Sequence, residues 1–186
     1  SQRGIEFHKN VAQGDTNLLI CLGDFGGNYF FNHRDKEFKR KLGTYPFDYF
    51  VIRGNHEERP SICMEKFPEN WHTEEYFGNI VYVENEFPYI KYALDVPAIY
   101  LIEGLRTLVL PGAYSVDKQY RLLNGISWFE NEQLSKEEMD RCLDILDEID
   151  WQVDIVLSHT CPVLFEPTDL FLSFVDQSQV DKKMER

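Results

Sequence analysis

The sequence predicts a single α/β domain, spanning residues 1–186, in which two mixed β-sheets pack together with helices flanking them. The first observation is that runs rich in valine, isoleucine and leucine at 17–23, 47–52 and 153–158 have the pattern of strands buried on both faces. The second is an amphipathic segment at 135–149, which favours a helix that covers a sheet. A chain of this length can bury a sizeable core.

The first half of the chain alternates helical and extended segments. In chain order, we expect a helix at 4–12, a strand at 17–23, a helix near 34–42, a strand at 47–52 and a helix or irregular segment at 60–77. Alternation of this kind is typical of parallel strands that are joined through helices.

The second half begins with short strands that no helix separates. These strands are expected near 79–84, 89–94, 97–102 and 105–110, and the short connections predict antiparallel pairing. The helix at 135–149 has a capping pattern, with Ser135 at its start and Glu138 three residues later. Its predicted apolar face consists of Leu143, Ile145, Leu146 and Ile149. A strand at 153–158 and a helix near 167–175 complete the prediction.

Side chains that can bind a metal follow each of the three apolar strands. Gly23-Asp24 follows the first, Gly54-Asn55-His56 follows the second, and Ser158-His159 follows the third. In sheets of this kind, ligands collect beyond the carboxyl ends of the strands. We therefore expect Asp24, Asn55, His56 and His159 to converge, although Gly-Asn-His alone could equally be a turn with an N-cap asparagine.

These blocks resemble the calcineurin-like metallophosphoesterases, in which Gly-Asp, Gly-Asn-His-Glu and a later lone histidine follow successive strands. The resemblance covers about residues 17–165 and includes the glycine-rich strand end 110–117. It is closest to a bacterial or phage-type branch, because of Tyr-Ser-Val-Asp-Lys at 114–118 and Leu-Ser-His-Thr at 157–160. It implies a four-layer α/β/β/α sandwich of two mixed sheets flanked by helices.

The resemblance also implies a site with two divalent metal ions, which could be manganese, iron or zinc. Asp24 would bridge the ions, and Asn55 and His159 would complete most of the protein shell of one of them. A metal-bound hydroxide would attack phosphorus, while His56 contacts the phosphate and protonates the leaving oxygen. Glu57 would either orient its neighbours or be a solvated loop carboxylate.

Two blocks of that family do not occur in this sequence, namely the opening Asp-X-His and the closing Gly-His-X-His. The chain also starts without methionine and stops within the polar run 176–186. We therefore expect a fragment, truncated at both ends, of a longer enzyme that carries the remaining ligands. Asp15 precedes a strand instead of ending one, so we interpret it as a turn residue.

Three arginines, Arg53, Arg59 and Arg121, could each offer a planar fork to a phosphate. For each of them, the alternative is a surface or structural ion pair. Asn28 lies four residues after Asp24, where relatives often carry aspartate, and we leave it out of the predicted site.

The composition of the chain excludes some classes of binding partner. The net charge of −13 argues against general binding to nucleic-acid backbones, which requires clustered lysine and arginine. No apolar stretch is long enough to cross a bilayer. The four scattered cysteines contain no Cys-X-X-Cys pair, and we expect them to be reduced in a cytoplasmic protein.

The expected function is hydrolysis of a phosphate mono- or diester by a dinuclear, metal-dependent phosphoesterase, with a phosphate ester as the substrate partner. Monoesters, diesters, nucleotides and phosphoproteins all remain open as substrates, and the sequence indicates no oligomeric state. One alternative is a non-catalytic protein of the same fold that acts as a protein-binding scaffold. Another is an unrelated α/β binding module whose strand ends match by chance.

Overall fold

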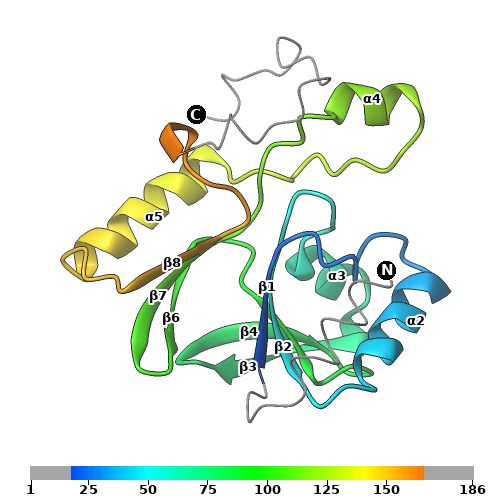
Figure 1. The fold of residues 1–186 in the computed structure, drawn as a ribbon, viewed down its shortest axis with the longest axis horizontal. Helices are drawn as coiled ribbons and strands as arrows, with labels where there is room; N and C mark the ends of the chain where they lie inside the picture. Colours follow the sequence, from blue (N-terminus) through cyan, green and yellow to red (C-terminus); the bar gives the residue numbers. More distant parts are fainter. Residues whose placement is uncertain (1–17, 166–186) are drawn as a thin grey trace.

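The computed structural model describes residues 18–165, which form two β-sheets with most of the helices on their outer faces (Figure 1). The helices predicted at 4–12 and 167–175 lie outside the described residues. The first sheet has the strand order β1 (Leu18–Leu22), β2 (Asp48–Ile52), β5 (Ile90–Ala93), β4 (Asn79–Glu84) and β3 (Trp71–Tyr76). The second has the order β6 (Ala98–Ile102), β7 (Leu105–Leu110) and β8 (Ile155–Ser158). The helices are α2 (His33–Leu42), α3 (Pro60–Lys66), α4 (Lys118–Leu123) and α5 (Lys136–Glu148), with short 3₁₀ turns at Pro68–Asn70 and Val163–Phe165.

Both sheets are mixed, as predicted. The strands β1, β2 and β5 run parallel, with Leu22 beside Ile52 at the end of the first pair, whereas β5, β4 and β3 pair antiparallel. In the second sheet β6 and β7 are antiparallel, and β8 joins β7 in parallel. Helices join β1 to β2 and β7 to β8, whereas the antiparallel neighbours follow one another through short connections.

The residues of β2 show how the layers form, because alternate side chains point to opposite faces of a strand. Tyr49 and Val51 join a core that α2 and α3 cover, and Phe50 and Ile52 join a core between the two sheets. A third core, which includes Leu108 of β7 and residues of α5, lies on the outer face of the second sheet. Three apolar layers between four layers of secondary structure make the predicted α/β/β/α sandwich.

The helix start at Ser135 has the predicted capping box. The Ser135 Oγ accepts from the Glu138 backbone N–H at 3.1 Å, and the Glu138 carboxylate accepts from the Ser135 N–H at 2.7 Å. Leu143, however, is 50% exposed, so its assignment to the apolar face was wrong. Cys142 and Leu146, four residues apart, are the buried residues of this helix.

Three expectations about the elements need correction. Residues 71–76 form the edge strand β3 instead of a helix or irregular segment, because alternate polar residues such as His72 and Glu74 suit a strand with one solvated face. The helix α4 was not predicted, and its six residues are too few for a clear period. Among the described residues β1 and β8 are edge strands, and Leu22 of β1 and Val156 of β8 are exposed, so neither strand is buried on both faces.

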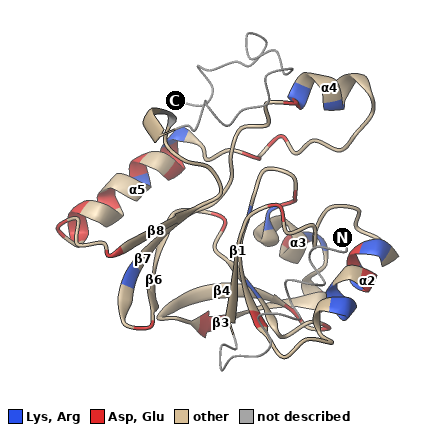
Figure 2. Cartoon of the chain, in the orientation of Figure 1, with Lys and Arg blue, Asp and Glu red and all other residues tan. Residues whose placement is uncertain are grey.

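Charge is unevenly spread over the surface (Figure 2). Acidic residues are concentrated on α5, whereas α2 carries several basic residues. Within residues 18–165, the helices are all too short or too polar to pass through a bilayer.

Candidate active site

The ends of β1, β2 and β8 bring the predicted site residues together. Asp24 Oδ1 accepts from the His56 backbone N–H at 3.1 Å and lies 3.5 Å from His159 Nε2. His159 Nε2 in turn lies 2.9 Å from Asn55 Oδ1. The ends of β1 and β2 in the first sheet supply the aspartate and the asparagine, and the end of β8 in the second sheet supplies the histidine. The three segments therefore converge as the sequence predicted.

The backbone after β1 is shaped to aim Asp24. Gly23 and Asp24 both have positive φ angles, of 93° and 49°. For a residue with a side chain, the left-handed region costs about 1–2 kcal/mol. Strain of this kind is common where a side chain must be held in one functional orientation. Gly54 allows the two loops to touch, because a Cβ there would lie 2.4 Å from both the nitrogen and Oδ1 of Asp24.

Replacing Gly23 with alanine is expected to disturb both stability and the site. A Cβ at Gly23 would lie 2.1 Å from His159 Nδ1, so the imidazole must move. Gly104→Ala is the matched control, because its φ is 79° but no atom lies within 4 Å of the added carbon. Urea unfolding should show a cost of about 1–2 kcal/mol for Gly104→Ala and a larger cost for Gly23→Ala. Equal costs in the two variants would contradict the close packing of Gly23 on His159.

The hydrogen bonds of His159 leave three atoms with lone pairs facing one another, one each from His159, Asn55 and Asp24. Its Nδ1 lies 2.7 Å from the Leu22 carbonyl oxygen, which can only accept, so Nδ1 carries a proton. The Nε2 then faces oxygens of Asn55 and Asp24, and all three atoms have lone pairs. Such a group is stable only with a proton or a cation between its members. One imidazole nitrogen, one amide oxygen and one carboxylate fit a divalent cation such as manganese, iron or zinc.

The described residues fit one ion better than two. Within residues 18–165, no group of three or more histidine, cysteine, aspartate or glutamate side chains is placed to hold a metal. The cluster at the strand ends combines only Asp24 and His159 with the neutral amide of Asn55. The number of ions therefore stays a prediction.

His56 lies beside the cluster and contacts Arg121. Arg121 Nη2 donates to His56 Nε2 at 3.1 Å, because a guanidinium cannot accept. The same arginine forms an ion pair with Asp117 at 2.8 Å and donates to the Ser127 carbonyl at 3.1 Å. Arg121 thus forms a structural ion pair, which was one of the two predictions for it, and it also contacts His56.

Glu57 joins the first two strand-end loops. Its Oε1 accepts from the backbone N–H groups of Gly54 at 3.1 Å and Phe25 at 3.4 Å. The side chain is buried, and burial raises the pKa of Glu57 while these two donors lower it. Glu57 therefore orients its neighbours, and the alternative of a solvated loop carboxylate is wrong.

The other two arginines bind protein groups. Arg53 is buried, with Nη1 donating to the carbonyl oxygens of Gly54 and Glu132, and burial lowers its pKa to about 10. Arg59 forms an ion pair with Glu138 and donates to three backbone carbonyls. Both arginines therefore stabilise the fold, in agreement with the alternative prediction of a structural role in place of a phosphate contact.

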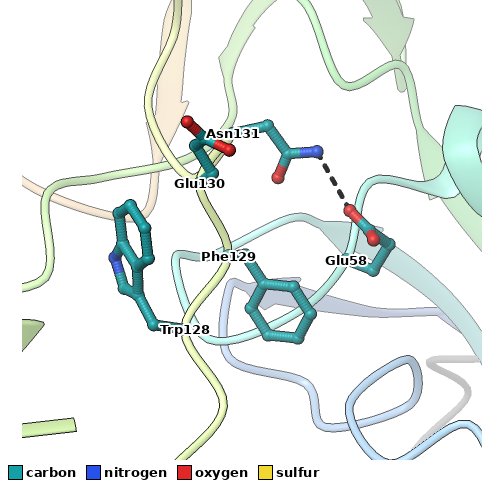
Figure 3. A pocket seen from close by; sticks show the side chains of 5 residues that line it. All are labelled: Glu58, Trp128, Phe129, Glu130 and Asn131. Carbon is teal, nitrogen blue, oxygen red and sulfur yellow. Dashed lines mark hydrogen bonds between the residues drawn. The ribbon is translucent and has the colours of Figure 1, made fainter. Parts of the chain in front are cut away.

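A pocket lies between Glu58 and the segment 128–131 (Figure 3). It is lined by Glu58, Trp128, Phe129, Glu130 and Asn131, and the Asn131 amide donates to Glu58 Oε1 at 3.0 Å. None of the four predicted site residues lines it. The ring of Phe129 packs 6.0 Å from that of Tyr29, so this segment also contacts the loop after β1.

Comparisons with known proteins agree with this arrangement. The model of the calcineurin-like phosphoesterase family matches residues 5–181, which is nearly the whole chain. Searches of the curated proteins and of the solved structures found no match. The match covers the strand-end residues whose convergence is described above. The chain belongs to the calcineurin-like phosphoesterase family.

Proposed function

We propose that this chain is a metal-dependent phosphoesterase that hydrolyses a phosphate mono- or diester, with Asp24, Asn55 and His159 as metal ligands and His56 as the catalytic acid. Family membership supports phosphoester hydrolysis in general. The observation that carries the finer proposal is a group of three atoms that can bind a metal, in which Asn55 Oδ1 and Asp24 Oδ1 lie 2.9 Å and 3.5 Å from His159 Nε2. Strand ends of this type are where ligands bind in α/β sheets.

A divalent cation at this cluster would polarise the phosphoryl oxygens and make water a stronger nucleophile. The residues of the chain supply its surroundings. The Leu22 carbonyl holds His159 Nδ1–H, which leaves Nε2 directed at the cluster. The His56 backbone N–H donates to Asp24 Oδ1 and limits the rotation of that carboxylate.

His56 and Arg121 would act on the phosphate and on the leaving group. In the proposed reaction the phosphate replaces His56 Nε2 as the partner of Arg121, so that the arginine neutralises phosphate charge. The freed imidazole would take a proton from solvent at Nε2 and give it to the alcohol oxygen as the bond from phosphorus to that oxygen breaks. Water supplies the new oxygen on phosphorus, and its proton restores the imidazolium.

The test is hydrolysis of 4-nitrophenyl phosphate and of bis(4-nitrophenyl) phosphate with and without Mn²⁺. Native protein is expected to lose turnover with a chelator and to regain it with Mn²⁺. Asp24→Asn keeps the size of the side chain but removes its charge, and should lower turnover through weaker metal binding by more than the factor of about 10–100 that loss of a ligand-orienting group costs. Asp154→Asn, which changes an exposed carboxylate that accepts from the Arg106 N–H, should leave turnover unchanged.

Absence of turnover on both esters, together with Mn²⁺ binding that Asp24→Asn does not weaken, would contradict the proposal. A chain that binds no metal and hydrolyses neither ester would instead match the protein-binding alternative. The family match supports hydrolysis over that alternative, and it rules out an unrelated α/β binding module.

A further inference from the structure

A buried chain of hydrogen bonds runs from the segment 128–132 through Ser115 to Asn55. The Asn55 amide nitrogen donates to Ser115 Oγ at 2.8 Å, and Ser115 Oγ donates to Glu132 Oε2. Glu132 also accepts from the Ser115 backbone N–H at 3.0 Å and from Trp128 Nε1 at 2.9 Å. Asn55, Ser115 and Glu132 are all buried, with exposed fractions of 7%, 1% and 2%.

The chemistry of these groups fixes the direction of every bond in the chain. A carboxylate only accepts, so Glu132 takes the single proton of the Ser115 hydroxyl. The serine oxygen can then only accept, so it must face the NH₂ end of Asn55. The amide oxygen of Asn55 is thereby turned to the opposite side, where it lies 2.9 Å from His159 Nε2.

Shape alone does not set this orientation, because the two ends of a carboxamide are nearly identical in size. A flipped Asn55 would place its NH₂ group against the metal cluster, where a cation would be repelled. Leaving a buried polar group unpaired costs free energy, so the hydrogen bonds to Ser115 and Glu132 determine the orientation of the Asn55 amide.

We propose that Ser115 and Glu132 are positioning residues that hold the Asn55 amide oxygen toward the divalent cation. The inference rests on the proposed function, because it assigns these two residues to the same metal site. The hydrogen bonds described for Ser115 and Glu132 reach Asn55 and not the His159 ring or the Asp24 carboxylate, so both residues act through Asn55. Trp128, which lines the pocket of Figure 3, extends the chain by donating to Glu132.

The first test compares Mn²⁺ affinity, measured by calorimetric titration, in the native protein and in Ser115→Ala and Glu132→Gln. Each variant is expected to bind Mn²⁺ about 10–100-fold more weakly, as for other groups that orient a metal ligand. Glu132→Gln is an independent variant. Its amide has one acceptor oxygen, whereas the two oxygens of the Glu132 carboxylate accept from the Ser115 N–H, the Ser115 hydroxyl and Trp128 Nε1. Thr107→Val is the matched control, because it removes a buried hydroxyl that donates to the Leu105 carbonyl on β7.

A second background separates positioning from a general effect on folding. In Asn55→Asp both side-chain oxygens accept, so orientation no longer matters, and adding Ser115→Ala should change Mn²⁺ affinity less than about twofold. An equal loss in both backgrounds would show that Ser115 acts through the fold, and would overturn the proposal. Native affinity in Ser115→Ala and Glu132→Gln would also overturn it. Native protein that binds no Mn²⁺ would overturn the metal-dependent function as well, so the two failures are distinguishable.

Discussion

Replacing His56 with alanine is expected to lower kcat for phosphate-ester hydrolysis by about 10²–10⁴-fold, the usual contribution of a positioned acid or base. The imidazole is half-buried beside the metal cluster and its Nε2 contacts Arg121. Only the backbone N–H of His56 reaches Asp24, and alanine keeps that hydrogen bond. Mn²⁺ affinity should therefore change little, and steady-state kinetics with a Mn²⁺ titration will separate the two effects.

His72→Ala is the control for this variant, because His72 is an exposed histidine on β3 that bonds to Asn85. It should retain full turnover. A His56→Ala enzyme with unchanged kcat, or one that loses metal binding in proportion to activity, would contradict the assignment of His56 as the catalytic acid.

Replacing Lys39 with alanine is expected to destabilise the fold by about 3–5 kcal/mol, because it leaves a buried carboxylate without its charge partner. Lys39 of α2 forms an ion pair with Glu84 of β4, and their side chains are only 4% and 10% exposed. The ammonium also donates to Asn28 Oδ1 at 3.0 Å and lies over the rings of Trp71 and Phe87. Urea unfolding of native and variant protein gives the difference directly.

The neighbouring pair of Lys36 and Glu86 gives a matched comparison on the same helix. Its side chains are 49% and 39% exposed, so solvent screens the charges. Lys36→Ala should cost about 0–1 kcal/mol. Similar costs for the two lysine variants would show that the ion pair of Lys39 is not buried in solution.

The sequence was most informative where strand geometry links distant residues. Hydrophobic runs that end in Gly23-Asp24, Gly54-Asn55 and Ser158-His159 predicted that these strand ends converge, because ligands collect beyond the carboxyl ends of such strands. The first two runs are parallel neighbours in the first sheet, and the third belongs to the second sheet. The capping box at Ser135 was also visible, since it depends on residues three positions apart.

Features that depend on contacts between distant segments were not visible. Nothing near Glu132 in the sequence indicates that its carboxylate meets Ser115, because the partner lies 17 residues away, beyond α4 and the loop that follows it. The contact of Arg121 with His56 likewise depends on where the short helix α4 lies. The edge positions of β1 and β8 depend on which strand pairs beside each, and composition does not encode that.

Anomalous diffraction from crystals grown with Mn²⁺ tests the central claim most directly. The expected result is a manganese peak within coordination distance of Asp24 Oδ1, Asn55 Oδ1 and His159 Nε2, atoms that already face one another in the structure. A manganese peak bound elsewhere, with these three side chains contacting only protein and water, would contradict it.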